Sequence, residues 1–548
     1  MQKTMVLNKL LILTFILFVL GSVDVYGQTS QIRTGQIIIQ GTKGKKIDDL
    51  MQAYDREGLL SGTILVAEKG DIIYKRGFGY ANAEFKVPNE ANTKFRLASI
   101  SKPIVAILVM KLVDQGKISL DGKLSDYLPD FRKDADKITV RHLLSHTSGL
   151  PGGIGDFTRR EMRDPVTREA LLKNSAENPL DFEPGTRVRY GLAGFAVLSM
   201  IVEKATGKSY EQALRENVLE PLGMRDTGVE DAASTVQRAP NGRIILGNPQ
   251  PVIERFATGY VKTRTGYLRA PYMDISTGGA GASIYSTVED LFLLDQALST
   301  NKLLSKQSKE QMFAPVLEDY SLGWNVRNLA FADLQKPTLP VFPGDQIRTE
   351  RADLKMVMKG GDVWGYTGFW AKVPEKEQTI IILLNGGGIA FNADVIRMTH
   401  GILNILYDLS YVTPRENMFV QILQQKGFEE AVKTFKQLKK EEPQNPIINE
   451  ATFNNLGYEY LNNKSHALAI DILKLNAESH PNSANAYDSL AEAYETSGNK
   501  EMAIKYYQKV LEVLPNDTSA NEQFKNRLKE NAQKKIKELS SPANSVRQ

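Results

Sequence analysis

The chain has 548 residues, of which 42% are hydrophobic and 24% are charged, and its formal net charge is only +4. These values are ordinary for a folded protein of two to four domains, exclude a mostly disordered chain or a fibrous repeat, and give no reason to expect nucleic acid. The absence of Cys excludes disulfides, thiolate zinc sites and a Cys nucleophile, and five His are too few to favour a multi-histidine metal site.

The first 27 residues have the pattern of a signal peptide. Lys3 and Lys9 accompany an apolar run over residues 10–20, which is too short to span a bilayer comfortably. We therefore expect a signal peptide over residues 1–27 and an exported protein, secreted or periplasmic, with no stable transmembrane span. An uncleaved N-terminal anchor is the alternative. The polar residues 28–46 predict a linker.

From residue 47 the pattern becomes that of a globular domain, predicted over residues 47–410. A helix over 47–54 precedes two strands joined by a hairpin turn at 68–71, and three strands return near the end of the domain. The segment between them is mainly helical. The expected strands cover residues 62–67, 72–77, 354–359, 368–373 and 379–385, and the expected helices cover 104–115, 140–145, 194–205, 209–219 and 288–298. This order predicts an α/β (α+β) fold with a helical insert.

After about residue 413 the composition changes, strand signals vanish and a repeat appears. Five positions recur 34 residues later, namely Phe453 and Tyr487, Leu456 and Leu490, Tyr460 and Tyr494, Ala469 and Ala503, and Pro481 and Pro515. This period resembles the tetratricopeptide repeat, which implies an all-α domain over residues 414–530 with a protein or peptide partner. A generic pair of helical hairpins is the alternative. We expect a disordered tail over residues 531–548.

The strongest chemical motif is Ser99-x-x-Lys102. On a helix these two side chains share one face, so the amine can reach the hydroxyl. Pro103 and the apolar run after it indicate that a helix begins here, which places Ser99 at a helix N-terminus. A desolvated Lys can take the proton of a Ser nucleophile without a His. No Gly-x-Ser-x-Gly motif occurs, and a His-dependent triad is poorly supported. An N-cap Ser with a solvated Lys is the alternative.

The surrounding sequence resembles the serine β-lactamase and penicillin-binding-protein family, specifically its class C β-lactamase-like branch. The resemblance covers roughly residues 47–410 and rests on stretches in the family's order, at residues 95–103, 138–150, 182–185, 221–224 and 278–291. It implies a β-lactamase/transpeptidase-like antiparallel sheet flanked by helices, with a helical subdomain. It also implies an acyl-enzyme mechanism without a cofactor.

The resemblance further implies roles for residues in two later motifs. Tyr190 matches the Tyr of the family's Tyr-x-Asn motif and is expected to act as general base and acid, whereas Leu192 replaces its Asn. Lys359-Gly360-Gly361 matches the Lys-Thr-Gly motif without its Thr. Lys359 is expected to supply a second positive charge. The backbone N–H of Asp362, which follows Gly361, is expected to form the oxyanion hole with that of Ser99. The alternatives are that Tyr190 is a half-buried core residue and that Lys359-Gly360-Gly361 is an ordinary strand-to-turn segment.

His142 and His146 are four residues apart, but no Glu lies between them as a zinc hydrolase of this type requires. We therefore expect no metal, and a packed, hydrogen-bonded His146 supporting the site. The sequence predicts an exported serine hydrolase acting on an amide or ester, which is a β-lactam, a D-amino-acid peptide or a small ester. The alternative is a catalytically weak β-lactamase-like binding or scaffold protein that works through its repeats.

Overall fold

The computed structural model divides into two compact units, one ending at Thr413 and the other beginning at Pro414. The structure describes residues 35–151, 163, 166–230, 236–238, 244–246, 252–263, 266–335, 353–387, 393–414, 418–441, 449–462, 464–519 and 522–540. The predicted signal peptide, the first part of the predicted linker and the end of the predicted tail lie outside these ranges. Within these ranges, no helix is both long and apolar enough to cross a membrane.

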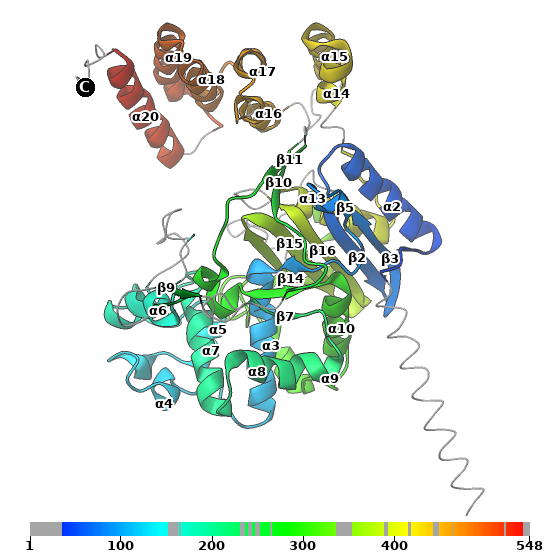
Figure 1. Cartoon of the computed structure of the whole chain (residues 1–548), viewed down its shortest axis with the longest axis vertical. Helices are drawn as coiled ribbons and strands as arrows, with labels where there is room; N and C mark the ends of the chain where they lie inside the picture. The colour runs from blue at the N-terminus through cyan, green and yellow to red at the C-terminus, as the bar shows by residue number, and fades with distance from the viewer. Residues whose placement is uncertain are drawn as a thin grey trace, which may run out of the picture. The chain divides into compact units, whose positions relative to one another are not determined.

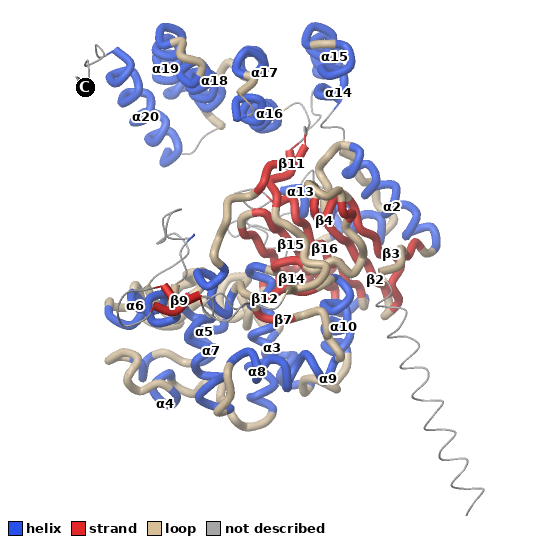
Figure 2. Tube along the Cα trace, in the orientation of Figure 1, coloured by secondary structure: helices blue, strands red, loops and turns tan. Residues whose placement is uncertain are grey.

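The first unit is built on a large sheet, whose strands are red in Figure 2. The sheet has seven strands, and its neighbouring strands are all antiparallel. In spatial order the strands are β1 (Ile38–Ile39), β3 (Asp71–Phe78), β2 (Gly62–Glu68), β16 (Gln378–Gly387), β15 (Gly365–Val373), β14 (Leu354–Val363) and β13 (Asn325–Leu329). The predicted hairpin joins β2 to β3. Strand β2, near the start of the unit, pairs with β16, near its end.

The central strands are apolar on both faces because helices cover both sides of the sheet (Figure 1). In β16, Ile380, Ile382 and Leu384 belong to one buried cluster, whereas Ile381 and Leu383 belong to the other. A strand buried on both faces has a continuous apolar run in place of an alternating pattern. The mixed α/β fold with an antiparallel sheet is therefore confirmed, and this run explains why β16 was recognisable in the sequence.

Two helices cover one face, and the helical insert covers the other together with α3 and α10. The first face packs α2 (Gly41–Arg56) and α13 (Ala393–Leu406). The opposite side carries α3 (Ser101–Asp114), α4 (Leu124–Tyr127), α5 (Val140–Leu144), α6 (Arg168–Glu177), α7 (Ala193–Thr206), α8 (Tyr210–Leu214), α9 (Glu220–Leu222), α10 (Val288–Ser299) and α11 (Lys306–Met312). Gly207 ends α7 with φ +67°, as its position in the sequence indicates.

The first unit begins before the predicted boundary at residue 47, so part of the predicted linker 28–46 was wrong. Strand β1 pairs with β3, and α2 already starts at Gly41. The start of this helix packs through its backbone, because a Cβ at Gly44 would lie 2.6 Å from the Ile73 carbonyl oxygen. Glycine permits this close approach but leaves no apolar signal, which is why the segment reads as a linker.

The second unit is all-helical, which confirms the predicted repeat fold. Its helices are α14 (Met418–Lys426), α15 (Phe428–Glu441), α16 (Glu450–Asn462), α17 (His466–Ser479), α18 (Ala484–Thr496), α19 (Lys500–Val513) and α20 (Glu522–Ser540). Positions that recur at the 34-residue spacing form the contacts between helices, since Phe453, Leu456, Leu490, Ala469 and Ala503 are all buried. The period in the sequence therefore corresponds to a repeated packing unit.

The last helix corrects the predicted tail over residues 531–548, because α20 continues to Ser540. Leu528 and Ala532 are buried in a small apolar cluster with α18 and α19, and the Lys535 ammonium donates a hydrogen bond to Glu495 at 2.7 Å. Few apolar residues are needed on a helix that covers the end of a repeat stack, so its sequence is highly polar. This polarity made residues 531–540 resemble a disordered tail.

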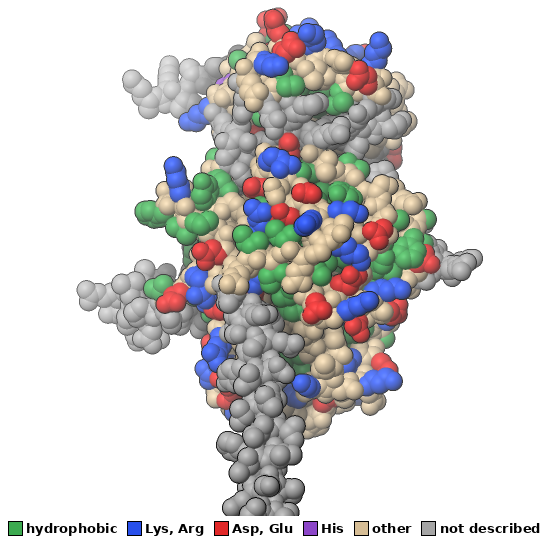
Figure 3. Space-filling model, turned by 90° about the vertical axis from the view of Figure 1, so that its right-hand side faces the viewer, with side chains coloured by type: hydrophobic (Ala, Val, Ile, Leu, Met, Phe, Trp, Pro, Cys, Tyr) green, Lys and Arg blue, Asp and Glu red, His purple; other side chains and the backbone are tan. Residues whose placement is uncertain are grey.

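Charges are mixed on the molecular surface. Figure 3 shows Lys and Arg side chains interspersed with Asp and Glu over the face that it draws. The described residues on this face therefore form no large field of one sign, in keeping with the small net charge of the chain.

Candidate active site

Ser99 lies in a tight turn at the start of α3. The 3-10 turn η1 (Ala98–Ile100) leads directly into this helix, and the Ile100 N–H donates to the Leu97 carbonyl oxygen at 3.0 Å. Ala98 has φ +48°, a conformation that costs free energy in a residue with a Cβ and persists only where the surroundings hold it. The fold thus uses a strained turn to place Ser99.

Two side chains donate hydrogen bonds to the hydroxyl of Ser99. Lys102 Nζ lies 3.0 Å from Ser99 Oγ, and the Tyr190 hydroxyl lies 2.5 Å from it. These groups come from η1, from the first turn of α3 and from the loop before α7. The structure therefore brings together the three residues that we predicted to carry the chemistry.

Lys102 is fully buried, and its surroundings are mainly apolar. Its ammonium donates to the Gly281 carbonyl oxygen at 3.2 Å, and it lies 4.8 Å from the ring centroid of Tyr190 and 5.6 Å from that of Phe195. Burial lowers the pKa of Lys102 to about 7. A substantial fraction of Lys102 is therefore a neutral amine near neutral pH, as a proton acceptor must be.

Two lysine ammonium groups lie near the ring of Tyr190. Lys359 Nζ lies 4.8 Å from the Tyr190 ring centroid, the same distance as Lys102 Nζ. The loop that carries Tyr190 is tied to the helical insert, because the Arg189 N–H donates to the His146 carbonyl oxygen at 2.8 Å. A negative charge that formed on the Tyr190 oxygen would thus have two lysine side chains close to its ring.

Lys359 projects from β14 into the same cluster. Its ammonium donates to Asn325 Oδ1 at 3.2 Å and lies 5.8 Å from the Tyr320 ring centroid. Burial lowers the pKa of Lys359 to about 8; the nearby Tyr190 opposes this shift, while the Lys102 charge adds to it. Lys359 is therefore mostly protonated at pH 7 and keeps the second positive charge of the site.

Strand β14 passes very close to the Ser99 turn. A Cβ at Gly361 would lie 2.2 Å from the Leu97 carbonyl oxygen and 3.0 Å from Ser99 N, so no larger residue fits there. Asp362 follows and pairs with Thr367 of β15, whose hydroxyl donates to its carboxylate at 2.5 Å. Burial raises the pKa of the Asp362 carboxyl to about 6. The backbone of β14 is thus adjacent to the backbone of the Ser99 turn.

His146 packs against the site, but the expected hydrogen bonding is wrong for one of its ring nitrogens. Its ring centroid lies 4.6 Å from Tyr190, 5.3 Å from Phe195 and 5.7 Å from Tyr320. Its Nε2 is buried without a hydrogen-bond partner among the described residues. Burial, followed by the charges of Lys359 and Lys102, lowers the pKa of His146 well below its usual value. A neutral ring thus packs within the aromatic group.

His142 has a different role, capping the start of α5 together with Thr139. Among the described residues, no group of three or more His, Asp and Glu side chains is arranged to hold a metal ion.

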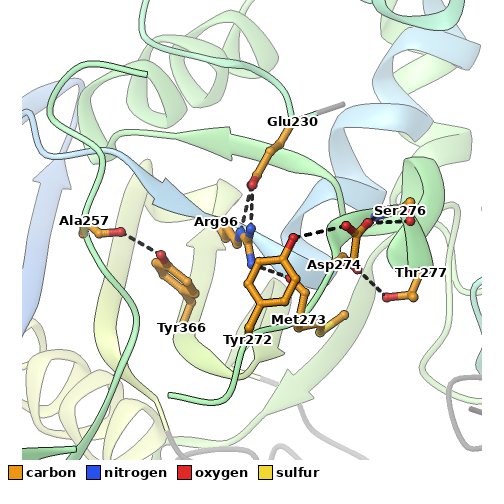
Figure 4. Close-up of polar contacts among 9 residues, drawn as sticks. All are labelled: Arg96, Glu230, Ala257, Tyr272, Met273, Asp274, Ser276, Thr277 and Tyr366. Carbon is orange, nitrogen blue, oxygen red and sulfur yellow. Dashed lines mark hydrogen bonds and ion pairs between the residues drawn. The ribbon is translucent and has the colours of Figure 1, made fainter. Parts of the chain in front are cut away.

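A second polar cluster holds the segment that leads to Gly281 (Figure 4). Arg96, three residues before Ser99, forms an ion pair with Glu230 at 2.5 Å and donates to the Met273 carbonyl oxygen at 3.3 Å. Asp274 then caps the 3-10 segment η6 (Ile275–Gly281), accepting a hydrogen bond from the Ser276 N–H at 3.1 Å. These contacts fix the segment whose last carbonyl group accepts from Lys102.

Sequence reasoning missed the residues that surround Lys102 and Lys359. They are Phe195, Tyr320, Asn325 and Gly281; Arg96, which helps to hold the segment that leads to Gly281, was missed as well. The sequence stretch at residues 278–279 pointed to the segment that ends at Gly281, and Arg96 is part of the motif that contains Ser99. Tyr320 and Asn325 had no comparable signal, because an isolated Tyr before a short strand, or an Asn at its first position, has no distinctive spacing.

Comparisons with known proteins find relatives of both units. A family model described as β-lactamase matches residues 45–400, and a tetratricopeptide repeat model matches residues 484–517. A penicillin-binding protein of Bacillus subtilis (strain 168) is 31% identical over 315 residues, which are 52% of this chain and 64% of that protein. The esterase EstB of Burkholderia gladioli is 37% identical over 216 residues, 37% of this chain and 54% of that protein.

The chain thus spans just under two thirds of the penicillin-binding protein and about half of the esterase. Among solved structures, a D-amino acid amidase from Ochrobactrum anthropi SV3 matches with a TM-score of 0.53 at 21% identity, covering 67% of this chain and 99% of that chain. The similarity to the amidase shows a shared fold.

Proposed function

The chain belongs to the β-lactamase family, and on this basis we propose that it is a serine hydrolase in which Ser99 forms an acyl-enzyme with an amide or ester. The observation that carries the proposal is the position of Ser99 Oγ, 3.0 Å from the Lys102 amine and 2.5 Å from the Tyr190 hydroxyl. Relatives named as a penicillin-binding protein, an esterase and an amidase support a hydrolase.

In the proposed reaction Ser99 Oγ attacks the substrate carbonyl carbon. Neutral Lys102 accepts the hydroxyl proton, and Tyr190 donates a proton to the departing nitrogen or oxygen. The negative oxygen of the tetrahedral intermediate accepts hydrogen bonds from the N–H groups of Ser99 and Asp362. Water then attacks the ester carbonyl carbon and gives a proton to the Tyr190 phenolate, while Lys102 returns its proton to Ser99 Oγ, which releases the acid and restores the site.

We propose simple esters or D-amino-acid derivatives as substrates, in preference to penicillins and cephalosporins. Leu192 replaces an amide that would contact a substrate amide, and Gly360 lacks a hydroxyl at the carboxylate end of the site. A site that recognises a substrate through hydrogen bonds loses discrimination when one partner is missing. The names of the similar esterase and amidase are compatible with this preference.

A covalent probe tests the mechanism without knowledge of the substrate. We expect a fluorophosphonate to label the protein once, at Ser99, and the Ser99→Ala variant to remain unlabelled. The kcat/KM values for a p-nitrophenyl ester, a D-amino-acid amide and a chromogenic cephalosporin then identify the substrate class. No labelling of the folded wild-type protein would leave the non-catalytic binding or scaffold function as the better explanation. Cephalosporin turnover far above that of the ester would contradict the proposed substrate class.

We also propose that the protein is exported and that its repeats bind a protein or peptide through their concave face. The support is the N-terminal sequence pattern and the stack of helical hairpins from α14 to α20. Cell fractionation with an antibody against the chain tests the first point, and capture of partners by residues 414–548 tests the second.

A further inference from the structure

The ammonium group of Lys102 has fewer hydrogen-bond acceptors than it has protons. Its acceptors among the described residues are Ser99 Oγ at 3.0 Å and the Gly281 carbonyl oxygen at 3.2 Å. The rings of Tyr190 and Phe195 face it as well. An ammonium carries three N–H donors, so its hydrogen bonding here is incomplete.

Leu192 packs with the Lys102 side chain over Gly281. A Cβ placed on Gly281 would lie 3.4 Å from Leu192 Cδ2 and 3.6 Å from Lys102 Cε, so both side chains pack over the same glycine. Leu192 is only 5% exposed. It occupies the N-cap position of α7, yet its side chain forms no capping hydrogen bond, since it has no polar atom. Hydrocarbon therefore packs over the same glycine as the end of the Lys102 stem.

The titratable groups around Lys102 offer no negative charge to balance it. Tyr190 lies beside its ammonium, while Lys359 and His146 belong to the same cluster. Within the described part of the chain, no carboxylate forms an ion pair with Lys102 or opposes the effect of burial on its pKa. The charge of Lys102 is therefore governed by hydration and by the number of hydrogen-bond acceptors.

We propose that Leu192 is a positioning residue that controls the charge of Lys102, by keeping water and a further hydrogen-bond acceptor away from its amine. Leu192 thereby favours the neutral form, which can take the proton of Ser99. The proposal rests on the serine hydrolase function proposed above and assigns a role to a residue that departs from the family's Tyr-x-Asn pattern. It explains how the site tolerates the loss of that Asn.

The pH dependence of Ser99 labelling tests this role. The measured quantity is the second-order rate constant for the fluorophosphonate from pH 5 to pH 9 in the full-length protein. We expect the wild-type rate constant to rise through about pH 7 as Lys102 loses its proton. In Leu192→Asn we expect the added amide oxygen to stabilise the ammonium. The pH midpoint of the rise in the rate constant should therefore increase by about one unit. Labelling at pH 6 then becomes about tenfold slower than in the wild type.

Leu192→Met is the matched control, because it keeps an apolar side chain of similar volume and should leave the rise where it is. Thermal unfolding of each variant verifies the fold, and Leu192→Gln replaces Leu192→Asn if the latter is unstable. A rise at the wild-type pH in a folded polar variant, or an equal displacement in Leu192→Met, would overturn the proposal. Absence of labelling in the wild-type protein would contradict the proposed function instead.

Discussion

The two units of this protein are built from contacts of very different range. In the first unit, the candidate active site combines a turn near residue 99, a loop near residue 190, a segment ending at Gly281 and a strand that carries Lys359. In the second unit, each helix packs mainly against the next helices along the chain. Proton transfer needs groups placed by a rigid long-range framework, whereas a repeat stack extends one local packing unit.

The two units also differ in how deeply their ion pairs are buried. In the first unit, Lys75 pairs with Glu289 at 2.6 Å, and Lys372 pairs with Asp295 at 2.9 Å, with all four side chains almost fully buried. Both pairs connect α10 to strands of the large sheet. In the second unit the Lys535–Glu495 pair is partly exposed. Breaking a buried pair leaves an uncompensated charge, so the framework around the first unit tolerates fewer changes.

The largest effect is expected for Ser99→Ala. This change removes one hydroxyl from a turn whose other contacts remain, so we expect no acyl-enzyme and an unchanged unfolding temperature. The mass of the intact protein after incubation with the fluorophosphonate shows whether Ser99 has been labelled, and calorimetry measures the unfolding temperature. Full activity in the Ser99→Ala variant would show that the chemistry lies elsewhere.

Tyr190→Phe should also lower kcat/KM, by a factor on the order of 10² to 10⁴.

Lys102→Met is expected to lower kcat/KM by a similar factor while making the first unit more stable. The depressed pKa of Lys102 means that the native state disfavours its charged form. This penalty is fully present below about pH 7 and disappears as the pH approaches 10.5, with an upper limit of roughly 5 kcal/mol. Chemical denaturation of both proteins at pH 6.5 and at pH 10 measures the difference in their free energies of unfolding at the two pH values. A less stable variant at pH 6.5 would contradict this reasoning.

A smaller effect concerns the pH profile. We expect kcat/KM to rise through about pH 7, where Lys102 becomes neutral, and to fall above about pH 8, where Lys359 loses its charge. In Lys359→Arg the guanidinium stays protonated, so the alkaline fall should disappear even if the maximum is lower. Initial rates on a p-nitrophenyl ester, corrected for spontaneous hydrolysis, measure both limbs. An alkaline fall that persists in Lys359→Arg would assign it to another group.

The smallest effect is expected from removing the second unit. Every residue of the candidate site lies before Thr413, where the first compact unit ends. A chain that stops at residue 413 should therefore hydrolyse a small ester with kcat/KM within about twofold of the full-length value. Circular dichroism and calorimetry provide the folding control. A folded but inactive shortened chain would show that the repeats complete the site.

The sequence predicted the fold of the second unit more readily than the contacts within the first unit. The 34-residue spacing was sufficient for the helical repeats, because each repeat packs against the next in the same way. In the first unit, Ser99 and Lys102 could be recognised because two residues three positions apart on a helical turn lie close together, whatever the rest of the fold does. Tyr320 and Asn325 could not, since only the folded sheet brings them to Lys359. The start of α2 was also missed, because Gly44 packs through its backbone.

The pairing of β2 with β16 has a consequence for how the chain folds as it is made. Ser61 and Asn385, whose side chains share a hydrogen bond at the end of this pair, are separated by 324 residues. The first hairpin therefore leaves one edge of β2 unpaired until almost the whole unit has been synthesised. Such long-range pairing slows folding and exposes apolar strands. Until β16 has been made, the apolar strand β2 stays exposed along that edge, which favours aggregation of the nascent chain.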